Sequence, residues 1–527
     1  MTDTATPIDH GAAPEPRAAI IDRLAAAEGL APLGAPDRPV VAVQGLGFVG
    51  AAMAIAVASA GTPRGAGAPA GGTSPLYTVV GIDLGDTAGR QRIDALNAGR
   101  FPFETTDAEL TAALDGARAR HNLICVEDPA AYSAADVVVV DVPLDISWRS
   151  DTPELRLTGF EAAIRTIGAH VRPGTLVLVE TTVPPGTTQK IVVPTLAEEL
   201  TARGIDPDSV LVAHSYERVM PGAEYFRSIV DYWRVYAGHT PTAADAAEQF
   251  LRSVIDTSEH PLTRVSNTTA SETAKVLENT FRATTIALME EWSRFAEAVG
   301  VDLFEVVDAI RLRPTHANMR TPGFGVGGYC LTKDPLFAKL AAQQLWDLPM
   351  EFPMSTAAVR TNDEAPLATL ERVKDLLGGE LSGRRIALLG ISYRQDVGDT
   401  RYSPSETFVR AAELAGATVV AHDPLVEHWE EFDRAIPGEL PSPVDVDAVV
   451  FAVPHDAYRT LDLAAWLDDA RPVVIDAFSV LSADQRTQLL DLGCAVTSIG
   501  RGTVTPSVAA TTPPTDPAPI NPDPETR

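Results

Sequence analysis

Cysteine and basic residues are both scarce in this 527-residue chain. Only three cysteines occur, with no CxxC pair and no HExxH string, so neither a disulfide framework nor a dedicated metal site is expected. The 42 Lys and Arg residues are outnumbered by 71 Asp and Glu residues, which gives a formal net charge of −29 and argues against nucleic acid as a partner. No apolar run reaches the roughly 18 residues that a membrane span requires, so no membrane insertion is expected.

Both ends of the chain lack the composition of a folded segment. Residues 1–35 are rich in Ala and Pro, and residues 506–527 are rich in Pro, Thr and Asp, so we expect two disordered tails. The first tail has no basic stretch followed by an apolar one, which argues against a signal peptide and favours a cytoplasmic protein. A third Pro/Gly-rich patch, at 61–75, indicates a surface loop inserted in the first domain.

The sequence between the tails is long enough for several folded domains. Hydrophobic residues make up 45% of the chain, which is typical of a globular protein with large cores. Two stretches in which apolar strands alternate with helices flank a helical middle. This pattern predicts an α/β fold of two Rossmann-like doubly wound domains joined by a helical central region. The predicted domain boundaries are 36–262, 263–372 and 373–505.

The first α/β unit begins with a dinucleotide-binding pattern. The apolar strand PVVAVQ runs into GLGFVG, and a helix of small residues follows; this is the strand–turn–helix context in which GxGxxG receives a pyrophosphate. A second strand, YTVVGIDL, ends in an acidic residue that can bind the ribose hydroxyls and favours NAD over NADP. The number of residues between the glycine motif and this acidic residue exceeds the usual spacing, and the insertion at 61–75 accounts for the excess. The residues expected to contact NAD are Gly45, Gly47, Phe48, Val49, Gly50, Asp83 and Thr182.

Three further apolar runs in this unit predict buried parallel strands. They lie at 135–143, 174–186 and 209–222 and stop at polar or proline-rich residues. Because the carboxyl ends of parallel strands line the ligand crevice, the polar residues there should share one rim. These rim residues are Thr181, Thr182, Glu217 and Arg218.

A long helix is predicted from Asn267 to Gly300. Apolar residues recur at helical spacing with few breakers, and the glycine is a plausible cap for the carboxyl end. Lys275 and Asn279 are four residues apart and therefore share one face. A helix of this length between two α/β domains is also a natural surface for a homodimer, and we expect a homodimer or a higher homo-oligomer.

The second α/β unit starts with a strand at 384–393. Its first turn lacks GxGxxG but holds Arg394 and Arg401 before a helix. This arrangement can grip a diphosphate that does not belong to a dinucleotide cofactor.

Cys330 lies in the glycine-dense stretch GFGVGGYCLTKDP. Its glycines allow a ligand to approach the backbone closely, and nearby Lys333 and Asp334 can tune a thiolate. A catalytic and a structural role for this cysteine are about equally compatible with the stretch alone. The loop glycines that we expect beside the substrate are Gly325, Gly327 and Gly328.

Taken together, these strings resemble the UDP-glucose/GDP-mannose dehydrogenase family. The resemblance runs in order over residues 38–503 and rests on several rare strings: VAVQGLGFVG, LNAGRFPFE, ETTVPPGTT, YERVMPG, AKVLENTFR, GFGVGGYCLTKDP, RTND, GDTRYSPS and HDP. It implies an NAD-binding domain, a helical middle that forms the dimer and a C-terminal nucleotide-sugar domain. It also implies oxidation of C6 of a nucleotide sugar to the uronate, with transfer of four electrons.

The resemblance assigns a role to each of several residues. Cys330 matches the nucleophile that forms a thiohemiacetal and then a thioester, and Lys275 matches the lysine that stabilises the oxyanion. Asn279 and Asp334 match a pair that positions water, and Glu217 matches an acid/base residue of thioester hydrolysis. Among the residues expected to bind substrate, Arg218, Gly325, Gly327, Gly328 and Arg401, the last matches a family residue that contacts the sugar nucleotide.

The chain departs from the family pattern at three positions. Leu144 stands where many members have a threonine, Tyr216 where a proline is common, and Tyr329 where enzymes for N-acetylhexosamines often have His. The substrate can therefore be a UDP-hexose or a UDP-N-acetylhexosamine. Alternatives are a GDP-mannose 6-dehydrogenase, a two-electron hydroxyacid dehydrogenase of similar architecture, and a catalytically inactive homologue that only binds nucleotide sugars.

Overall fold

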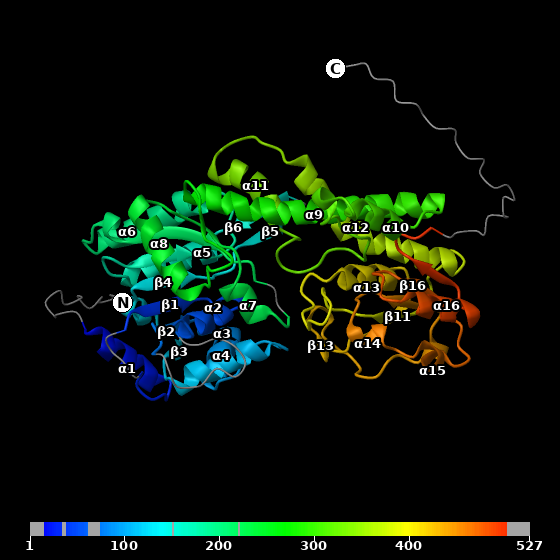
Figure 1. Ribbon diagram of the computed structural model, residues 1–527, viewed down its shortest axis with the longest axis horizontal. Helices are drawn as coiled ribbons and strands as arrows, with labels where there is room; N and C mark the ends of the chain where they lie inside the picture. Colours follow the sequence, from blue (N-terminus) through cyan, green and yellow to red (C-terminus); the bar gives the residue numbers. More distant parts are fainter. Residues whose placement is uncertain (1–14, 34–37, 62–73, 150–151, 220–221, 503–527) are drawn as a thin grey trace, which may run out of the picture.

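The computed structural model shows two lobes below one long helix (Figure 1). It describes residues 15–33, 38–61, 74–149, 152–219 and 222–502. The outer part of the first predicted tail, the whole of the second and most of the predicted loop at 61–75 lie outside these residues. The prediction of an α/β fold with two doubly wound sheets around a helical centre is confirmed.

The first lobe contains an eight-stranded sheet in the order β10-β9-β8-β7-β4-β1-β2-β3. All neighbouring strands are parallel except β8 and β9, so the carboxyl ends of β8, β7, β4, β1 and β2 meet at one edge. The strands are β1 (Val40–Gln44), β2 (Thr78–Ile82), β3 (Leu123–Val126), β4 (Val137–Val140), β7 (Leu176–Val179), β8 (Leu211–Tyr216), β9 (Val235–Gly238) and β10 (Thr263–Arg264). A separate hairpin pairs β5 (Asp145–Arg149) with β6 (Thr152–Arg156).

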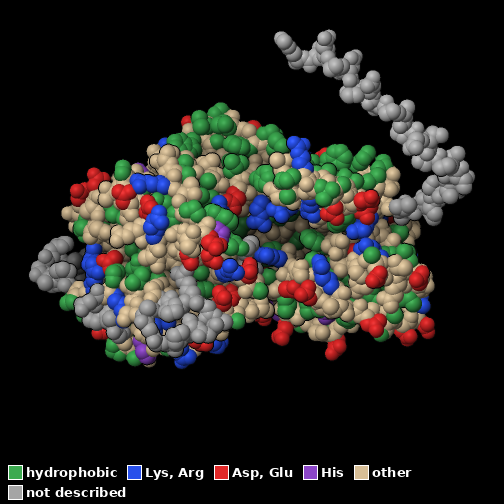
Figure 2. All heavy atoms as spheres, in the orientation of Figure 1, with side chains coloured by type: hydrophobic (Ala, Val, Ile, Leu, Met, Phe, Trp, Pro, Cys, Tyr) green, Lys and Arg blue, Asp and Glu red, His purple; other side chains and the backbone are tan. Residues whose placement is uncertain are grey.

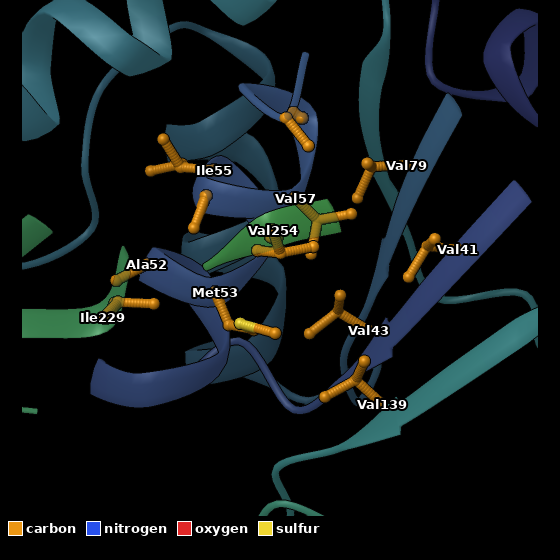
Figure 3. Close-up of a cluster of buried hydrophobic side chains, with 14 of the residues drawn as sticks. Val41, Val43, Ala52, Met53, Ile55, Val57, Val79, Val139, Ile229 and Val254 are labelled. Carbon is orange, nitrogen blue, oxygen red and sulfur yellow. The ribbon is translucent and has the colours of Figure 1, made fainter. Parts of the chain in front are cut away.

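Helix α2 (Phe48–Ala58) lies at the centre of the first lobe. It is apolar on every side, and each of its residues from Gly50 to Ala58 is buried, as expected for a helix enclosed by its neighbours. Figure 3 shows Met53 and Val57 of this helix facing Val43 and Val139 of the sheet. The other helices of this lobe are α1 (Arg17–Ala27), α3 (Thr87–Asn97), α4 (Ala108–Ala119), α5 (Thr158–His170), α6 (Val193–Ala202), α7 (Tyr225–Val230) and α8 (Pro241–Val254).

Helix α9 (Thr268–Val299) bridges the two lobes (Figure 1). Its predicted ends are confirmed: the Asn267 side chain accepts a hydrogen bond from the Ala270 N–H, and Gly300 has the left-handed φ of +78° that favours glycine. The other central helices are α10 (Leu303–Arg311), α11 (Asp334–Leu340) and α12 (Pro353–Leu376), and α12 packs along α9.

The second lobe has a five-stranded parallel sheet in the order β12-β11-β15-β16-β17. Its strands are β11 (Arg385–Leu389), β12 (Thr418–His422), β15 (Ala448–Phe451), β16 (Val473–Asp476) and β17 (Val496–Ser498), with a small hairpin of β13 (His428–Trp429) and β14 (Arg434–Ala435). Its helices are α13 (Pro404–Leu414), α14 (Asp456–Arg459), α15 (Leu463–Leu467) and α16 (Ala483–Asp491).

The expectation of a disordered tail over residues 1–35 is wrong for α1 (Arg17–Ala27). Ile20, Ile21 and Leu24 of this helix are at most 5% exposed and pack into the core of the first lobe. An ion pair of 2.6 Å joins Arg17 to Asp136. The high Ala and Pro content concealed a short apolar stripe, and tertiary packing stabilises a helix that composition alone does not predict.

Deletion of residues 1–27 is therefore expected to destabilise the first lobe. Loss of the three buried aliphatic side chains of α1 should cost about 4.5–9 kcal/mol of unfolding free energy, at roughly 1.5–3 kcal/mol for each side chain. Urea denaturation of the full-length and truncated chains measures the difference. An unchanged midpoint in the truncated chain would show that α1 contributes nothing to stability.

Candidate active site

The glycine turn after β1 fits a dinucleotide pyrophosphate. Gly45 has a φ of +88°, and a Cβ there would lie 2.6 Å from the carbonyl oxygen of Asp141. A Cβ on Gly50 would overlap the carbonyl of Gly45. Gly47, by contrast, precedes the first turn of α2 with open space around its α-carbon. The amino end of α2 at Gly47 is therefore accessible to an anion.

The carboxylate predicted to bind the ribose, Asp83, lies at the carboxyl end of β2. It accepts hydrogen bonds from the Leu46 N–H at 3.0 Å and the Leu84 N–H at 2.8 Å. Arg92 of α3 donates to it at 2.7 Å, a partner that the sequence pattern did not identify. These contacts fix the carboxylate at the edge of the glycine turn.

Phe48, at the start of α2, lies between the two lobes. The ring of Phe103 stacks on it at 3.9 Å, and the guanidinium of Arg401 from the second lobe lies 4.4 Å from its ring centre. Asp399 accepts from Arg401 at 2.7 Å. Arg401 is thus next to the cofactor turn, although its predicted ligand is the substrate.

The predicted rim residues do lie at the carboxyl edge of the first sheet. Thr181 donates its hydroxyl to the carbonyls of Val140 at 3.0 Å and Val142 at 2.9 Å, so this side chain joins the ends of β7 and β4. Arg218 pairs with Glu278 of α9 at 2.8 Å. Thr182 is half-buried beside Thr181.

Four of the five predicted catalytic side chains form two buried contacts. Lys275 donates to the backbone carbonyl of Glu217 at 2.7 Å, and its Nζ lies 3.7 Å from the Glu217 carboxylate. Asn279, one helical turn further along α9, donates to Asp334 at 2.7 Å. The other oxygen of Asp334 accepts from Lys333 at 2.8 Å. The pairing of Asp334 with two donors keeps a carboxylate satisfied inside the protein.

Cys330 is the exposed residue of this cluster. Surrounding protein nevertheless displaces much of the water that would solvate a thiolate, and this desolvation together with the charge of Asp334 raises the pKa of Cys330 to about 11. The cations of Lys275 and Lys333 oppose the shift. The thiol therefore lies where a lysine can favour its ionised form.

The glycine loop before Cys330 packs against the second lobe. Gly325 and Gly328 have φ angles of +128° and +86°. A Cβ on Gly327 would lie 2.6 Å from Tyr393, and one on Gly328 would lie 2.8 Å from the ring of the same residue. The loop thus needs glycine for this approach, and this contact places Cys330 between the lobes.

Three arginines that lie near Cys330 have no side-chain hydrogen bond or ion pair with any described residue. Arg282 belongs to α9, Arg320 to the segment before the glycine loop, and Arg394 to the first turn of the second lobe. Burial and the charges of Arg320 and Arg394 lower the pKa of Arg282, and the charge of Cys330 acts on it in the opposite sense. Figure 2 shows basic side chains gathered where the lobes face each other. Only Arg394 of the three was singled out from sequence.

The departures from the family pattern are visible in the same region. The Leu144 side chain is fully buried in the core, and its carbonyl accepts from the Tyr329 hydroxyl at 3.4 Å. Tyr216 lies beside Arg218, whose guanidinium donates to its hydroxyl at 3.1 Å. Tyr329 thus ties the cysteine loop to the segment after β4.

The fold and the site define an NAD-dependent dehydrogenase that has a second nucleotide-binding lobe. The chain belongs to the UDP-glucose/GDP-mannose dehydrogenase family, whose models match the NAD binding domain at 40–254, the central domain at 269–364 and the UDP binding domain at 387–483. Within the described residues, no group of acidic, His and Cys side chains could hold a metal ion, and no helix is long and apolar enough to cross a membrane.

Similar proteins include dehydrogenases named for two N-acetylated sugars. The UDP-N-acetyl-D-mannosamine dehydrogenase of Pyrococcus horikoshii is 29% identical, covering 88% of this chain and 100% of that protein. An NDP-N-acetyl-D-galactosaminuronic acid dehydrogenase of Ralstonia nicotianae is 28% identical, covering 81% of this chain and 93% of that protein. The solved structure of a UDP-D-ManNAc dehydrogenase from P. horikoshii superposes with a TM-score of 0.71 at 28% identity, covering 88% and 100% of the two chains.

Proposed function

We propose that this protein oxidises C6 of a UDP-N-acetylhexosamine to the uronate in two NAD-dependent steps. The observation that carries the proposal is the position of Cys330, between the buried Lys275–Glu217 and Asn279–Asp334 contacts of the first two domains and the arginine cluster around Arg282. The names of the two relatives favour an N-acetylated sugar. A reduced Cys330 is needed, which favours the cytoplasm.

The second lobe offers a site for the nucleotide part of the substrate. A cavity of about 180 Å³ lies between the glycine loop and this lobe. Its apolar walls include Phe324 and Phe478, which suit a nucleobase, and Arg394 lies at its edge. The guanidiniums of Arg282 and Arg320, which pair with no described residue, are available to a diphosphate that extends from this cavity toward Cys330.

Lys275 and Cys330 are the residues that we assign to the oxidation steps. NAD, when bound at the glycine turn, supplies the hydride acceptor for both oxidations. The C6 alcohol becomes an aldehyde by losing a hydride to the bound cofactor and its hydroxyl proton to water, and Lys275 stabilises the oxygen as that proton leaves. The Cys330 sulfur then adds to the aldehyde carbon to give a thiohemiacetal, and loss of a second hydride and a proton leaves a thioester.

Asn279, Asp334 and Glu217 are assigned to hydrolysis of the thioester. The Asn279–Asp334 contact places an amide and a carboxylate beside Cys330, where they can orient water. Glu217 accepts a proton from that water as it attacks the thioester carbon. The C–S bond breaks, the uronate leaves, and the Cys330 sulfur is free for another turnover. Each uronate thus requires two molecules of NAD.

The test is the yield of NADH per sugar from the purified protein with a panel of UDP-GlcNAc, UDP-GalNAc, UDP-ManNAc, UDP-glucose, UDP-galactose and GDP-mannose. Two NADH and one uronate from an N-acetylated UDP-sugar are expected. One NADH per sugar would contradict the four-electron reaction. No NADH from any substrate, despite binding of NAD and a nucleotide sugar, would indicate an inactive homologue.

Replacement of Arg282 by leucine is expected to weaken substrate binding more than catalysis. The guanidinium has no hydrogen-bond or ion-pair partner among the described residues, so folding should not suffer, whereas a charge contact with the diphosphate would be removed. We expect the KM for the sugar nucleotide to rise about 10- to 100-fold, with the KM for NAD unchanged. Arg227→Leu, a surface arginine of α7 that is ion-paired with Asp231, is the matched control. Equal KM values in both variants would exclude Arg282 from the substrate site.

We also propose that the protein is a homodimer that buries the exposed face of α9. Six large apolar residues on this helix are between 44% and 62% exposed, and their spacings of four, seven, four, three and four place them on one stripe: Leu277, Phe281, Leu288, Trp292, Phe295 and Val299. Hydrophobic side chains also gather over this part of the molecule in Figure 2. Sedimentation equilibrium would give twice the mass of the chain, and a monomer would refute the assignment.

A further inference from the structure

A row of polar side chains crosses the carboxyl edge of the first-lobe sheet. In the strand order β9-β8-β7-β4-β1, each strand contributes one residue at or next to that edge: Arg234, Glu217, Glu180, Asp141 and Gln44. The reaction proposed above uses only Glu217. If ionised, the other two carboxyl groups, Asp141 and Glu180, would place further negative charge beside the site of an anionic cofactor. Their protonation state therefore affects cofactor binding.

Asp141 and Glu180 are in direct contact. Glu180 and Arg234 form an ion pair in which the side chains are 0% and 1% exposed. The side chains of Glu180 and Asp141 lie within hydrogen-bonding reach of each other, and one buried oxygen of each receives no hydrogen bond from any described residue. Two carboxyl groups can share a hydrogen bond only if one of them holds a proton. Burial, followed by the charge of Glu180, raises the pKa of Asp141 well above its usual range. Asp141 is thus the neutral donor and Glu180 the carboxylate that pairs with Arg234.

The backbone of Asp141 packs directly beneath the glycine turn. Its carbonyl oxygen is the atom that a Cβ on Gly45 would meet at 2.6 Å, and its own Cβ would lie 3.1 Å from a Cβ on Gly50. One carboxyl oxygen of Asp141 is buried and has no hydrogen-bond partner within the described residues. A negative charge here would lie close to the pyrophosphate of a dinucleotide held by the same turn.

We propose that Asp141 must hold its proton for the glycine turn to bind NAD, so that cofactor binding is linked to the protonation of this one residue. When pH rises through the pKa of Asp141 in the free protein, the carboxylate that forms repels the diphosphate. Bound NAD in turn raises this pKa further, because the proton removes the repulsion. Binding therefore takes up a proton in the pH range between the free and bound pKa values, and NAD affinity falls across that range.

Several other charged groups face Asp141, and the test has to distinguish their titration from that of Asp141. Glu180, Glu217 and Arg234 act on it from β7, β8 and β9, and Gln44 on β1 carries no charge. His214 of β8 is no competitor near neutral pH because burial lowers its pKa to about 3. Glu272 of α9 is a competing titratable group, because burial raises its pKa to about 7. It accepts a hydrogen bond from the Thr188 N–H at 2.7 Å, in the segment after β7.

The experiment is calorimetric titration of the full-length protein with NAD from about pH 6 to about pH 9, without substrate. For the unmodified protein we expect the Kd to rise about tenfold or more once the pH exceeds the pKa of Asp141 in the free protein, with proton uptake measured from buffers of different ionisation enthalpy. Asp141→Asn keeps a hydrogen-bond donor toward Glu180 but cannot ionise. Its Kd should stay near the low-pH value at every pH, and its proton uptake should vanish.

Two more variants make the assignment specific. Glu180→Gln removes the charge that raises the pKa of Asp141 and leaves Arg234 to pair with Asp141, so weak NAD binding should extend to lower pH. Glu272→Gln should leave the pH dependence intact. A Kd of the unmodified protein that does not change with pH, or a pH dependence that survives in Asp141→Asn, would overturn the proposal. If Asp141→Asn does not fold, the proton uptake of the unmodified protein and the shift in Glu180→Gln decide. None of these readouts depends on which sugar is oxidised.

Discussion

Replacement of Cys330 by serine is expected to abolish uronate formation while NAD and substrate still bind. A serine hydroxyl is a far weaker nucleophile than a thiolate and cannot form the thioester from which the acid is released. The C6 alcohol can still lose one hydride with the help of Lys275. We therefore expect at most one NADH per sugar and a loss on the order of a thousandfold or more in the rate of uronate release.

The measurement compares NADH and uronate yields under single-turnover conditions. Cys494→Ala is the matched control, since this thiol is buried in the core of the second lobe, away from the site, and its loss should leave the yield at two NADH per sugar. Two NADH from Cys330→Ser would rule out covalent catalysis by this residue. One NADH per sugar from both variants, as from the unmodified protein, would instead indicate a two-electron dehydrogenase in which Cys330 has no role.

Local patterns in the sequence predicted most of the framework correctly. The apolar runs before Gly45 and after 384 became buried parallel strands, and helix α9 begins after Asn267 and ends at Gly300 as expected. These elements are specified by periodicity and by caps, which a single sequence carries. Helix α1 was missed because its three buried aliphatic residues gain their stability from contacts with a distant part of the chain.

The candidate site could be predicted only in part. The contact between Asn279 and Asp334 joins residues 55 positions apart, and the motif strings suggested it only through the family resemblance. Arg92 and Arg320 had no such signal, because an arginine in a helix or a loop is normally solvated or ion-paired. Arg282 ends the string AKVLENTFR, but no role was assigned to it there. Their relevance depends on which partners the fold brings to them or withholds from them. The same holds for Asp141, whose proton depends on Glu180 from another strand.

Lys275 and Asp334 are expected to have opposite effects on the thiol of Cys330 and the same effect on turnover. The cation of Lys275 lowers the pKa of Cys330, and the carboxylate of Asp334 raises it. In Lys275→Met this pKa should rise further above about 11, and alkylation of the thiol at a fixed pH should slow. In Asp334→Asn it should fall, and alkylation should become faster. Turnover should nevertheless drop about 10²- to 10³-fold in both, because oxyanion stabilisation is lost in one and water positioning in the other.

Rates of iodoacetamide labelling as a function of pH, measured beside steady-state turnover, separate these two effects. Lys339→Met, which removes a lysine on the far side of α11 that is ion-paired with Glu351, controls for a general loss of positive charge. A variant that perturbed folding would also expose the buried thiols of Cys125 and Cys494, so unchanged labelling of these two residues controls for unfolding. If Asp334→Asn labelled faster and also turned over faster, the thiolate population would limit the reaction and Asp334 would have no catalytic role. Faster labelling with slower turnover would show that Asp334 is retained for the hydrolysis step, although it makes the nucleophile harder to ionise.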